Sequence, residues 1–206
     1  MDYVYVCTTG EKRFKIGYTK RTPEKRRKEH ATGNPSDLNP VVEFQLDKAR
    51  KLETFLKNRF YKYKCKTGTS TEHYEYNCTI DELRERIQEE KKLFDELLLL
   101  EEQADQYEKC NSSNEMKKPS EQIKKLCSDL YQVEGQIVNL KYHQEELKSQ
   151  IKIFIQDFMG VEGLVTWKTR LSKKFDSQKF KTENEELYNA YMIENKSRVF
   201  DLLAKG

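Results

Sequence analysis

The chain has 206 residues, of which 36% are hydrophobic and 35% are charged, with a formal net charge of +3. This length predicts one or two modest domains. So much charge is typical of long exposed helices and argues against one very large core. The absence of a signal-like or membrane-spanning apolar run predicts an intracellular protein of the cytoplasm or nucleus, not secreted and not bound to a membrane. The five cysteines include no C-x-x-C pair and are expected to be reduced thiols: Cys7, Cys65, Cys78, Cys110 and Cys127.

The charge is divided unevenly along the chain. Residues 1–78 hold 17 basic and 10 acidic side chains, residues 79–109 hold 5 and 11, and residues 110–206 hold 16 and 14. The basic excess therefore lies on the first segment, where a polyanion would be held. A solvated face of mixed charge explains the acidic middle better than it explains the N-terminal segment.

Two strands and a helix are predicted first. Residues 2–7 are β-branched or aromatic in alternation, and residues 14–19 repeat the pattern after a turn signal, so the two runs predict a β-hairpin. Pro23 follows Thr22 as a helix start, and the helix is expected to run to His30.

A second strand and helix pair follows. The run VVEFQL at 41–46 predicts a third strand. Apolar residues recur at helical spacing from 48 to 61, with Glu53 near the middle of that helix. HYEY at 73–76 predicts a last short strand.

Long helices are predicted next. Thr79 and Glu82 form a T-x-x-E capping box for a helix that runs to about residue 109. Residues 110–119 are rich in Asn, Ser and Pro and are read as a linker.

Residues 120–158 carry a coiled-coil pattern. Apolar side chains alternate at steps of three and four, and Gln144 is the single polar member of the seam. The seam predicts association with a second chain in parallel, or packing back onto the helix of 79–109. A homodimer is favoured because Glu90 and Glu101 break the apolar stripe of that helix. The seam consists of Ile123, Leu126, Leu130, Val133, Ile137, Leu140, Gln144, Leu147, Ile151, Phe154 and Phe158.

The last segment predicts a small α/β unit. Residues 164–169 and 198–203 resemble strands, and the residues between them resemble a helix with Asp176 as its cap. This unit is too short to bury much apolar surface alone, so it is expected to pack on the helical stalk or across a dimer.

Five side chains of the first segment suit metal-assisted cleavage of a phosphodiester: Tyr5, Lys15, Arg26, His30 and Glu53. Such hydrolysis needs an activated water and a cation that neutralises charge on the phosphoryl oxygens. Glu53 can hold one Mg²⁺ (or Mn²⁺), since Mg²⁺ accepts one carboxylate together with waters and substrate oxygens. Arg26 and His30 lie one helical turn apart. A tyrosine pKa near 10 makes a poor base, but a neighbouring ammonium such as Lys15 favours the phenolate.

DNA is the expected partner of this segment. Six further basic residues cluster in the sequence around the five side chains and are predicted to contact nucleic acid: Lys12, Arg13, Lys20, Arg21, Arg27 and Lys28.

The order YVYV, KIGYT, R-x-x-x-H and LETFL resembles the GIY-YIG endonuclease superfamily, in particular its phage, viral and fungal-meiosis branch with KIG in place of YIG. The resemblance covers about residues 1–78. It implies Tyr5 as general base, Lys15 at the second-motif tyrosine, Arg26 and His30 as the helix pair, and Glu53 as the metal ligand. The first motif lacks its glycine, and the nearest candidates for the late asparagine are His73 and Asn77.

A second resemblance covers about residues 130–202, where VTWKT, KKFDSQKFKTENEELYNAY and SRVF are similar to the tail of YqaJ-type viral recombinase proteins. It implies an accessory or docking module and brings no catalytic residues.

The expected fold is α/β (α+β), with three parts. Residues 1–78 form a small GIY-YIG-like sheet flanked by helices, residues 79–160 a helical coiled-coil stalk, and residues 161–206 an accessory module. The expected function is metal-dependent cleavage of DNA. Two alternatives are a non-catalytic DNA-binding or assembly protein, and a coiled-coil scaffold whose N-terminal module binds protein.

Overall fold

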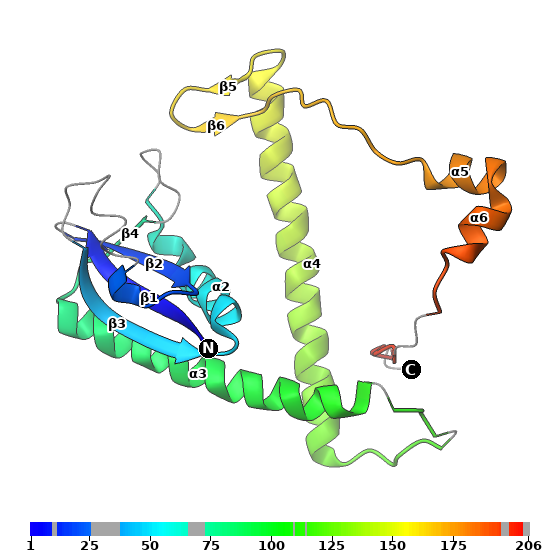
Figure 1. The fold of residues 1–206 in the computed structure, drawn as a ribbon, viewed down its shortest axis with the longest axis horizontal. Coiled ribbons are helices and arrows are strands. Elements are labelled where there is room, and N and C mark those ends of the chain that lie inside the picture. The colour runs from blue at the N-terminus through cyan, green and yellow to red at the C-terminus, as the bar shows by residue number, and fades with distance from the viewer. Residues whose placement is uncertain are drawn as a thin grey trace. The chain divides into compact units, whose positions relative to one another are not determined.

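The computed structural model describes residues 1–9, 12–25, 38–65, 73–108, 110–113, 115–194 and 198–203. The chain divides into two compact units, residues 1–105 and residues 106–206. The fold is mixed α/β, as predicted, with one four-stranded antiparallel sheet and long helices (Figure 1).

The sheet of the first unit consists of β1 (Asp2–Thr9), β2 (Arg13–Thr19), β3 (Leu38–Leu46) and β4 (His73–Glu75). Its spatial order is β3-β1-β2-β4, and every pair is antiparallel. The predicted hairpin and the two later strands are therefore confirmed. A register shift between Val6 and Cys7 interrupts the pairing of β1 with β3. The predicted helix from Pro23 to His30 lies mostly outside the described residues.

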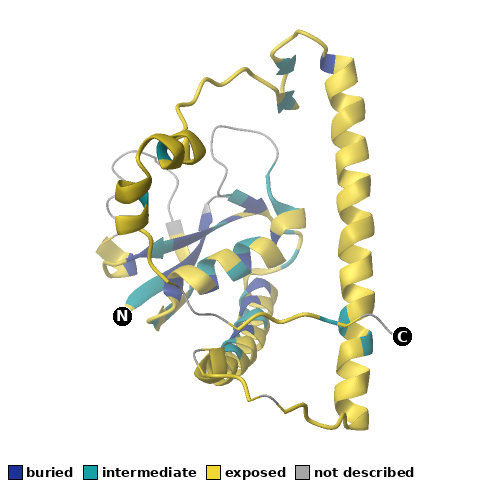
Figure 2. Cartoon of the chain, turned by 90° about the vertical axis from the view of Figure 1, so that its right-hand side faces the viewer, coloured by how far each residue is buried: buried dark blue, intermediate teal, exposed yellow. Residues whose placement is uncertain are grey.

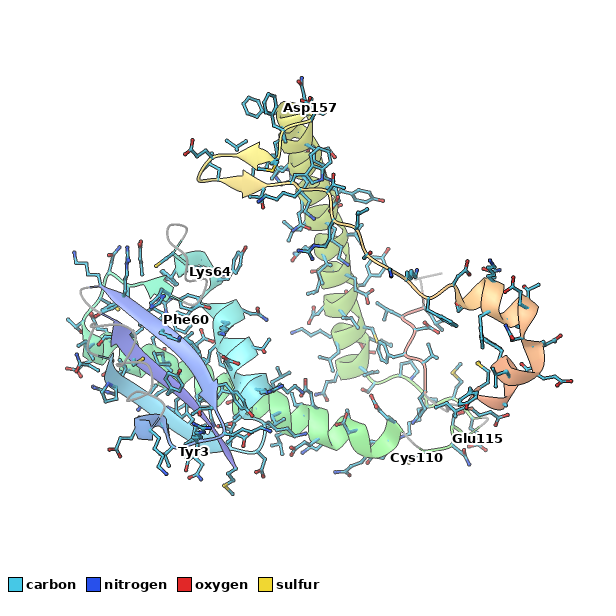
Figure 3. All side chains as sticks on the ribbon, turned by 45° about the horizontal axis from the view of Figure 1, so that its top comes forward. Tyr3, Phe60, Lys64, Cys110, Glu115 and Asp157 are labelled. Atoms are coloured by element: carbon cyan, nitrogen blue, oxygen red, sulfur yellow. The ribbon has the colours of Figure 1, made fainter. Side chains whose placement is uncertain are left out.

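One face of the sheet carries the core. Alternate residues of β1 and β2, from Val4 to Ile16, point to this face and are almost fully buried. Two helices cover it, α2 (Ala49–Arg59) and α3 (Ile80–Glu108). They contribute the buried residues Ala49, Leu52, Leu56, Leu83, Ile87 and Phe94, and Phe60 adds its ring just after α2 (Figure 3).

Ion pairs join α2 to α3. Arg59 Nε lies 2.6 Å from a carboxylate oxygen of Glu90, and Lys51 pairs with Glu101. The two glutamates that interrupt the apolar stripe of α3 thus hold α2 in place. The capping box is confirmed, because Thr79 N–H donates to Glu82 at 2.7 Å and Glu82 N–H donates to Thr79 Oγ1 at 3.2 Å.

In the second unit, α4 (Glu121–Ile155) forms the predicted long helix. Ser120 caps its start by accepting a hydrogen bond from Ile123 N–H at 3.3 Å. The helix ends three residues before Phe158, since Gln156 has a φ of 53°. Among the residues of α4 only Ile155 is buried, so the seam side chains face solvent (Figure 2).

The remaining elements are short. They are β5 (Gly160–Val161) and β6 (Val165–Thr166), which form a hairpin, and α5 (Ser177–Glu183) and α6 (Glu185–Ala190). Asp176 caps α5 as predicted, by accepting from Lys179 N–H at 2.9 Å. The predicted strand at 198–203 is wrong, because these residues have no strand partner within the described ranges and Val199 and Phe200 remain about four-fifths exposed.

No helix within the described ranges is long and apolar enough to cross a membrane.

Candidate functional site

The face of the sheet opposite α2 carries Tyr5. Because side chains alternate along a strand, Tyr5 and Cys7 point away from the core face formed by Val4 and Val6. Tyr5 is only 2% exposed and Cys7 is fully buried, although neither belongs to the main core. Tyr5 lies between Gly17 on β2 and Glu43 on β3 in the register of the sheet. The phenol is therefore held in the centre of the sheet.

Gly17 and Tyr5 are in unusually close contact. A Cβ added at Gly17 would lie 2.4 Å from Tyr5 Cζ and 2.5 Å from Tyr5 Oη, closer than nonbonded carbon and oxygen atoms approach. The ring of Tyr5 thus lies directly over the backbone of β2 at the glycine of the KIG sequence. Any larger residue at 17 would force the phenol to move.

Lys15 and His73 share the face of Tyr5. Lys15 stands opposite Cys7 on β1 and opposite His73 on β4. Lys15 is one diagonal step from Tyr5, a spacing of about 7–8 Å that long side chains bridge. Both Lys15 and His73 are half-buried. Sheet register therefore brings a phenol, an ammonium and an imidazole onto one face.

Glu53 comes from the other side of the sheet, because α2 packs on the core face. The flank of α2 that carries Glu53 is turned away from α3: Arg50, three residues earlier, places its guanidinium 5.0 Å from the ring centre of Tyr18 on β2. Phe55, on the opposite flank, contacts Phe94 of α3. Glu53 thus lies toward the β2 side of the sheet, as the ring of Tyr5 does, but on the opposite face.

Lys57 pairs with Glu53. The ammonium is 2.9 Å from Glu53 Oε1, and the carboxylate side chain is 20% exposed. Within the described residues Glu53 Oε2 has no ion pair or hydrogen bond. A single carboxylate with one oxygen available fits Mg²⁺, which keeps most of its waters. The described parts of the chain hold no group of three or more His, Cys, Asp or Glu that could bind a metal, so waters and substrate oxygens would complete the coordination.

Four predicted residues lie outside the described ranges: Arg26, Arg27, Lys28 and His30. The other four basic residues form two pairs instead of one cluster. Lys12 and Arg13 stand at the start of β2 and Lys20 and Arg21 just after its end. Seven steps along the strand, about 23 Å at roughly 3.3 Å each, separate Arg13 from Lys20. Arg13 is also 3.9 Å from Glu75. A nucleic acid that contacts both pairs must run along β2.

A separate cavity of about 150 Å³ lies on the core side of β4, and its lining includes the rings of Phe14, Phe60, Tyr63 and Tyr76. Asn77 lines this cavity, whereas His73 lies on the face of Tyr5. The guanidinium of Arg86 lies 4.9 Å from the ring centre of Tyr63 and donates to its hydroxyl at 2.8 Å. That hydrogen bond lowers the pKa of Tyr63. Of the two candidates for the late polar position, His73 is thus the one that the sheet register places on the face of Tyr5.

Sequence reasoning missed one neighbour of the site, Lys57. Lys57 is four residues after Glu53 in a helix, and this spacing alone predicts the ion pair. His73 was one of two candidates for the late polar position, and its place beside Lys15 depends on the pairing of β2 with β4, which are far apart in the chain.

Comparison with known families matches residues 2–91 to the T5orf172 domain. No curated protein and no solved structure matches the chain. The matched range contains the whole four-stranded sheet, α2 and the first turns of α3. The match indicates a nuclease-like or DNA-binding role for this part of the chain.

Proposed function

We propose that the N-terminal unit is a GIY-YIG-type endonuclease that cleaves DNA with the help of Mg²⁺ or Mn²⁺. The observation that carries the proposal is the contact between Tyr5 and Gly17, which fixes the phenol over the strand that also bears Lys15. A fixed phenol beside an ammonium loses its own proton to solvent more readily, and the resulting phenolate can accept a proton from water. The T5orf172 match over residues 2–91 supports the same role.

Each side chain has a distinct task in this proposal. Tyr5 takes the proton of the attacking water, and Lys15 favours the negative phenolate. Arg26 and His30 bind the scissile phosphate. A metal ion held by Glu53 would neutralise the charge that develops on the phosphoryl oxygens. Lys57, paired with Glu53 Oε1, would hold the carboxylate in one orientation for the metal.

His73 is the candidate for the late polar position that this proposal includes in the site. It stands next to Lys15 on the face of Tyr5, and an imidazole there can donate a proton to the leaving alkoxide. We therefore assign it the position that a late polar residue takes in the resemblance.

The alternative is a DNA-binding module without turnover. The Glu53–Lys57 ion pair favours this reading, because it satisfies one carboxylate oxygen without any metal. The position of α2 on the face opposite Tyr5 favours it too, because it separates the carboxylate from the phenol. In that case the ammonium of Lys57 takes the place of the metal ion beside Glu53. The unit would then bind DNA without cleaving it.

A nicking assay on supercoiled plasmid distinguishes the two functions. The wild-type protein should nick plasmid with Mg²⁺ or Mn²⁺ and fail to do so with EDTA, and Glu53→Ala should abolish nicking while DNA binding persists. Glu85→Ala, an exposed residue of α3, is the matched control and should nick like wild type. Binding without nicking by wild type under both metals would support the non-catalytic module instead.

A further inference from the structure

The helix α4 exposes a continuous apolar stripe. Its seam residues remain about half exposed, for example Ile137 at 45% and Leu147 at 46%, and Leu140 reaches 67%. An apolar face of about five heptads is a surface that proteins normally cover. In α3, by contrast, Leu83 and Phe94 are already buried in the core of the first unit.

We propose that α4 pairs with a second copy of itself in antiparallel orientation. This pairing does not depend on the nuclease function. In heptad notation the a positions are 123, 130, 137, 144 and 151, and the d positions are 126, 133, 140, 147 and 154. The antiparallel register that uses every one of these ten residues places Ile137 against Leu140 of the second copy.

The charges beside the seam separate the two orientations. In a parallel pair, position g of one helix meets position e of the next heptad in the other, so Asp129 would face Glu134, twice per dimer. In the antiparallel register e meets e, so Glu134 faces Lys141 of the second copy, twice per dimer. The parallel dimer thus contains the like-charge contact between Asp129 and Glu134, and the antiparallel dimer replaces it with the opposite-charge contact between Glu134 and Lys141.

Glu134 and Lys141 are available for such contacts. Among the described residues neither has an ion pair within its own chain, whereas Lys124 pairs with Glu121 at 2.6 Å and Lys148 with Glu145 at 2.7 Å. The two charges that would meet across the antiparallel interface are therefore not already neutralised along the helix.

The sizes of the side chains that meet at the ends of α4 also favour the antiparallel orientation. In the antiparallel register Phe154 packs against Ile123 of the second copy, so a large side chain meets a medium one. A parallel pair would stack Phe154 on Phe154 at one end. Gln144 alone favours parallel order, because two amides could then pair. In the antiparallel dimer it faces Val133 in the layer next to the central pair of Ile137 and Leu140.

Charge reversal tests the orientation on the full chain. Glu134→Lys creates two Lys–Lys contacts in the antiparallel dimer and should raise the dimer Kd about tenfold. The double variant Glu134→Lys/Lys141→Glu should restore wild-type affinity. In a parallel dimer Glu134→Lys would instead relieve the contact with Asp129 and tighten association. Sedimentation velocity over a concentration series measures the dimer Kd and so distinguishes the two orientations. Lys125→Glu, on the outer face of the helix, is the charge-matched control for Lys141→Glu.

Cysteine crosslinking gives a second reading that does not depend on affinity. Ile151 lies opposite Leu126 of the second copy in the antiparallel register, so Leu126→Cys/Ile151→Cys should form a covalent dimer on mild oxidation. Leu126→Cys alone should add no crosslink beyond the wild-type background. A crosslink from Leu126→Cys alone would establish parallel order, and a wild-type chain that stays monomeric at all concentrations would overturn the proposal.

Discussion

The ring of Tyr5 lies on Gly17 and requires glycine at this position. A Cβ at this position would nearly overlap Tyr5 Cζ and Oη, so the glycine serves a side chain on the neighbouring strand, and no turn or positive φ is involved. The absence of a side chain at 17 is thus what allows Tyr5 to be both buried and near the β2 side of the sheet.

Gly17→Ala should destabilise the protein by about 1–3 kcal/mol, because the added methyl group overpacks against the phenol. The same substitution in a Tyr5→Ala background should cost much less, since the clashing ring is gone. Urea unfolding of the four proteins gives the coupling free energy. Additive effects of the two substitutions would mean that the ring and the glycine do not constrain each other.

Tyr5→Phe isolates the role of the hydroxyl. The ring still covers Gly17, so the free energy of unfolding should change little, while the nicking rate falls by about 10²–10⁴-fold, as for loss of a general base. Single-turnover nicking with Mg²⁺ measures the rate, and Tyr3→Phe on the same strand is the control. A Tyr5→Phe protein that is unstable yet fully active would make the phenol structural only.

Among the secondary-structure elements, α4 carries a glycine in its middle. Gly135 lies on α4, with open space around the position where a Cβ would be. No close approach requires glycine there, so it only lowers the stability of the helix.

Gly135→Ala should therefore stabilise the helical unit by about 1 kcal/mol. The measurement is thermal unfolding followed by circular dichroism at 222 nm. Position 135 is on the outer face of the heptad, so the dimer Kd should not change apart from the gain in helix content. A loss of stability would show that this glycine has a packing partner.

The capping box makes the stability of α3 depend on pH. The hydrogen bond from Thr79 N–H lowers the pKa of Glu82. A carboxyl whose pKa is lower in the folded state stabilises the fold above its ordinary pKa of about 4.3 and loses that contribution as pH falls through the lowered value. Glu82→Gln should flatten the stability profile below about pH 4.5, compared with the exposed control Glu85→Gln. An unchanged profile would mean that the bond is not maintained in solution.

For the whole molecule, the two basic pairs at the ends of β2 predict how DNA affinity depends on salt. If Lys12, Arg13, Lys20 and Arg21 all contact phosphates, log K should fall with log[salt] with a contribution of roughly −0.9 from each contact. Substituting Lys20 and Arg21 with Gln should reduce the slope by about 1.8. Lys173→Gln/Lys174→Gln in the second unit is the control, and a slope that the Lys20 and Arg21 substitutions leave unchanged would place the DNA elsewhere.

The local elements of this protein follow from the sequence because they depend on neighbours in the chain. Alternation of β-branched and aromatic residues predicted β1 and β2, the T-x-x-E spacing predicted the start of α3, and the three-four repeat predicted α4. The expected strand at 198–203 failed because a strand needs a partner, and no local pattern supplies one. The resemblance named Tyr5, Lys15 and Glu53 as site residues, and their roles stay a prediction.

Relations between distant segments were decided only by the tertiary structure. The pairing of β2 with β4 put His73 beside Lys15, and the docking of α2 on the core face placed Glu53 on the opposite side of the sheet from Tyr5. Glu90 and Glu101 look like defects in an apolar stripe, yet they bind Arg59 and Lys51 of α2. Sequence periodicity reports which side of an element is buried, whereas the partner of that side depends on contacts made across the fold.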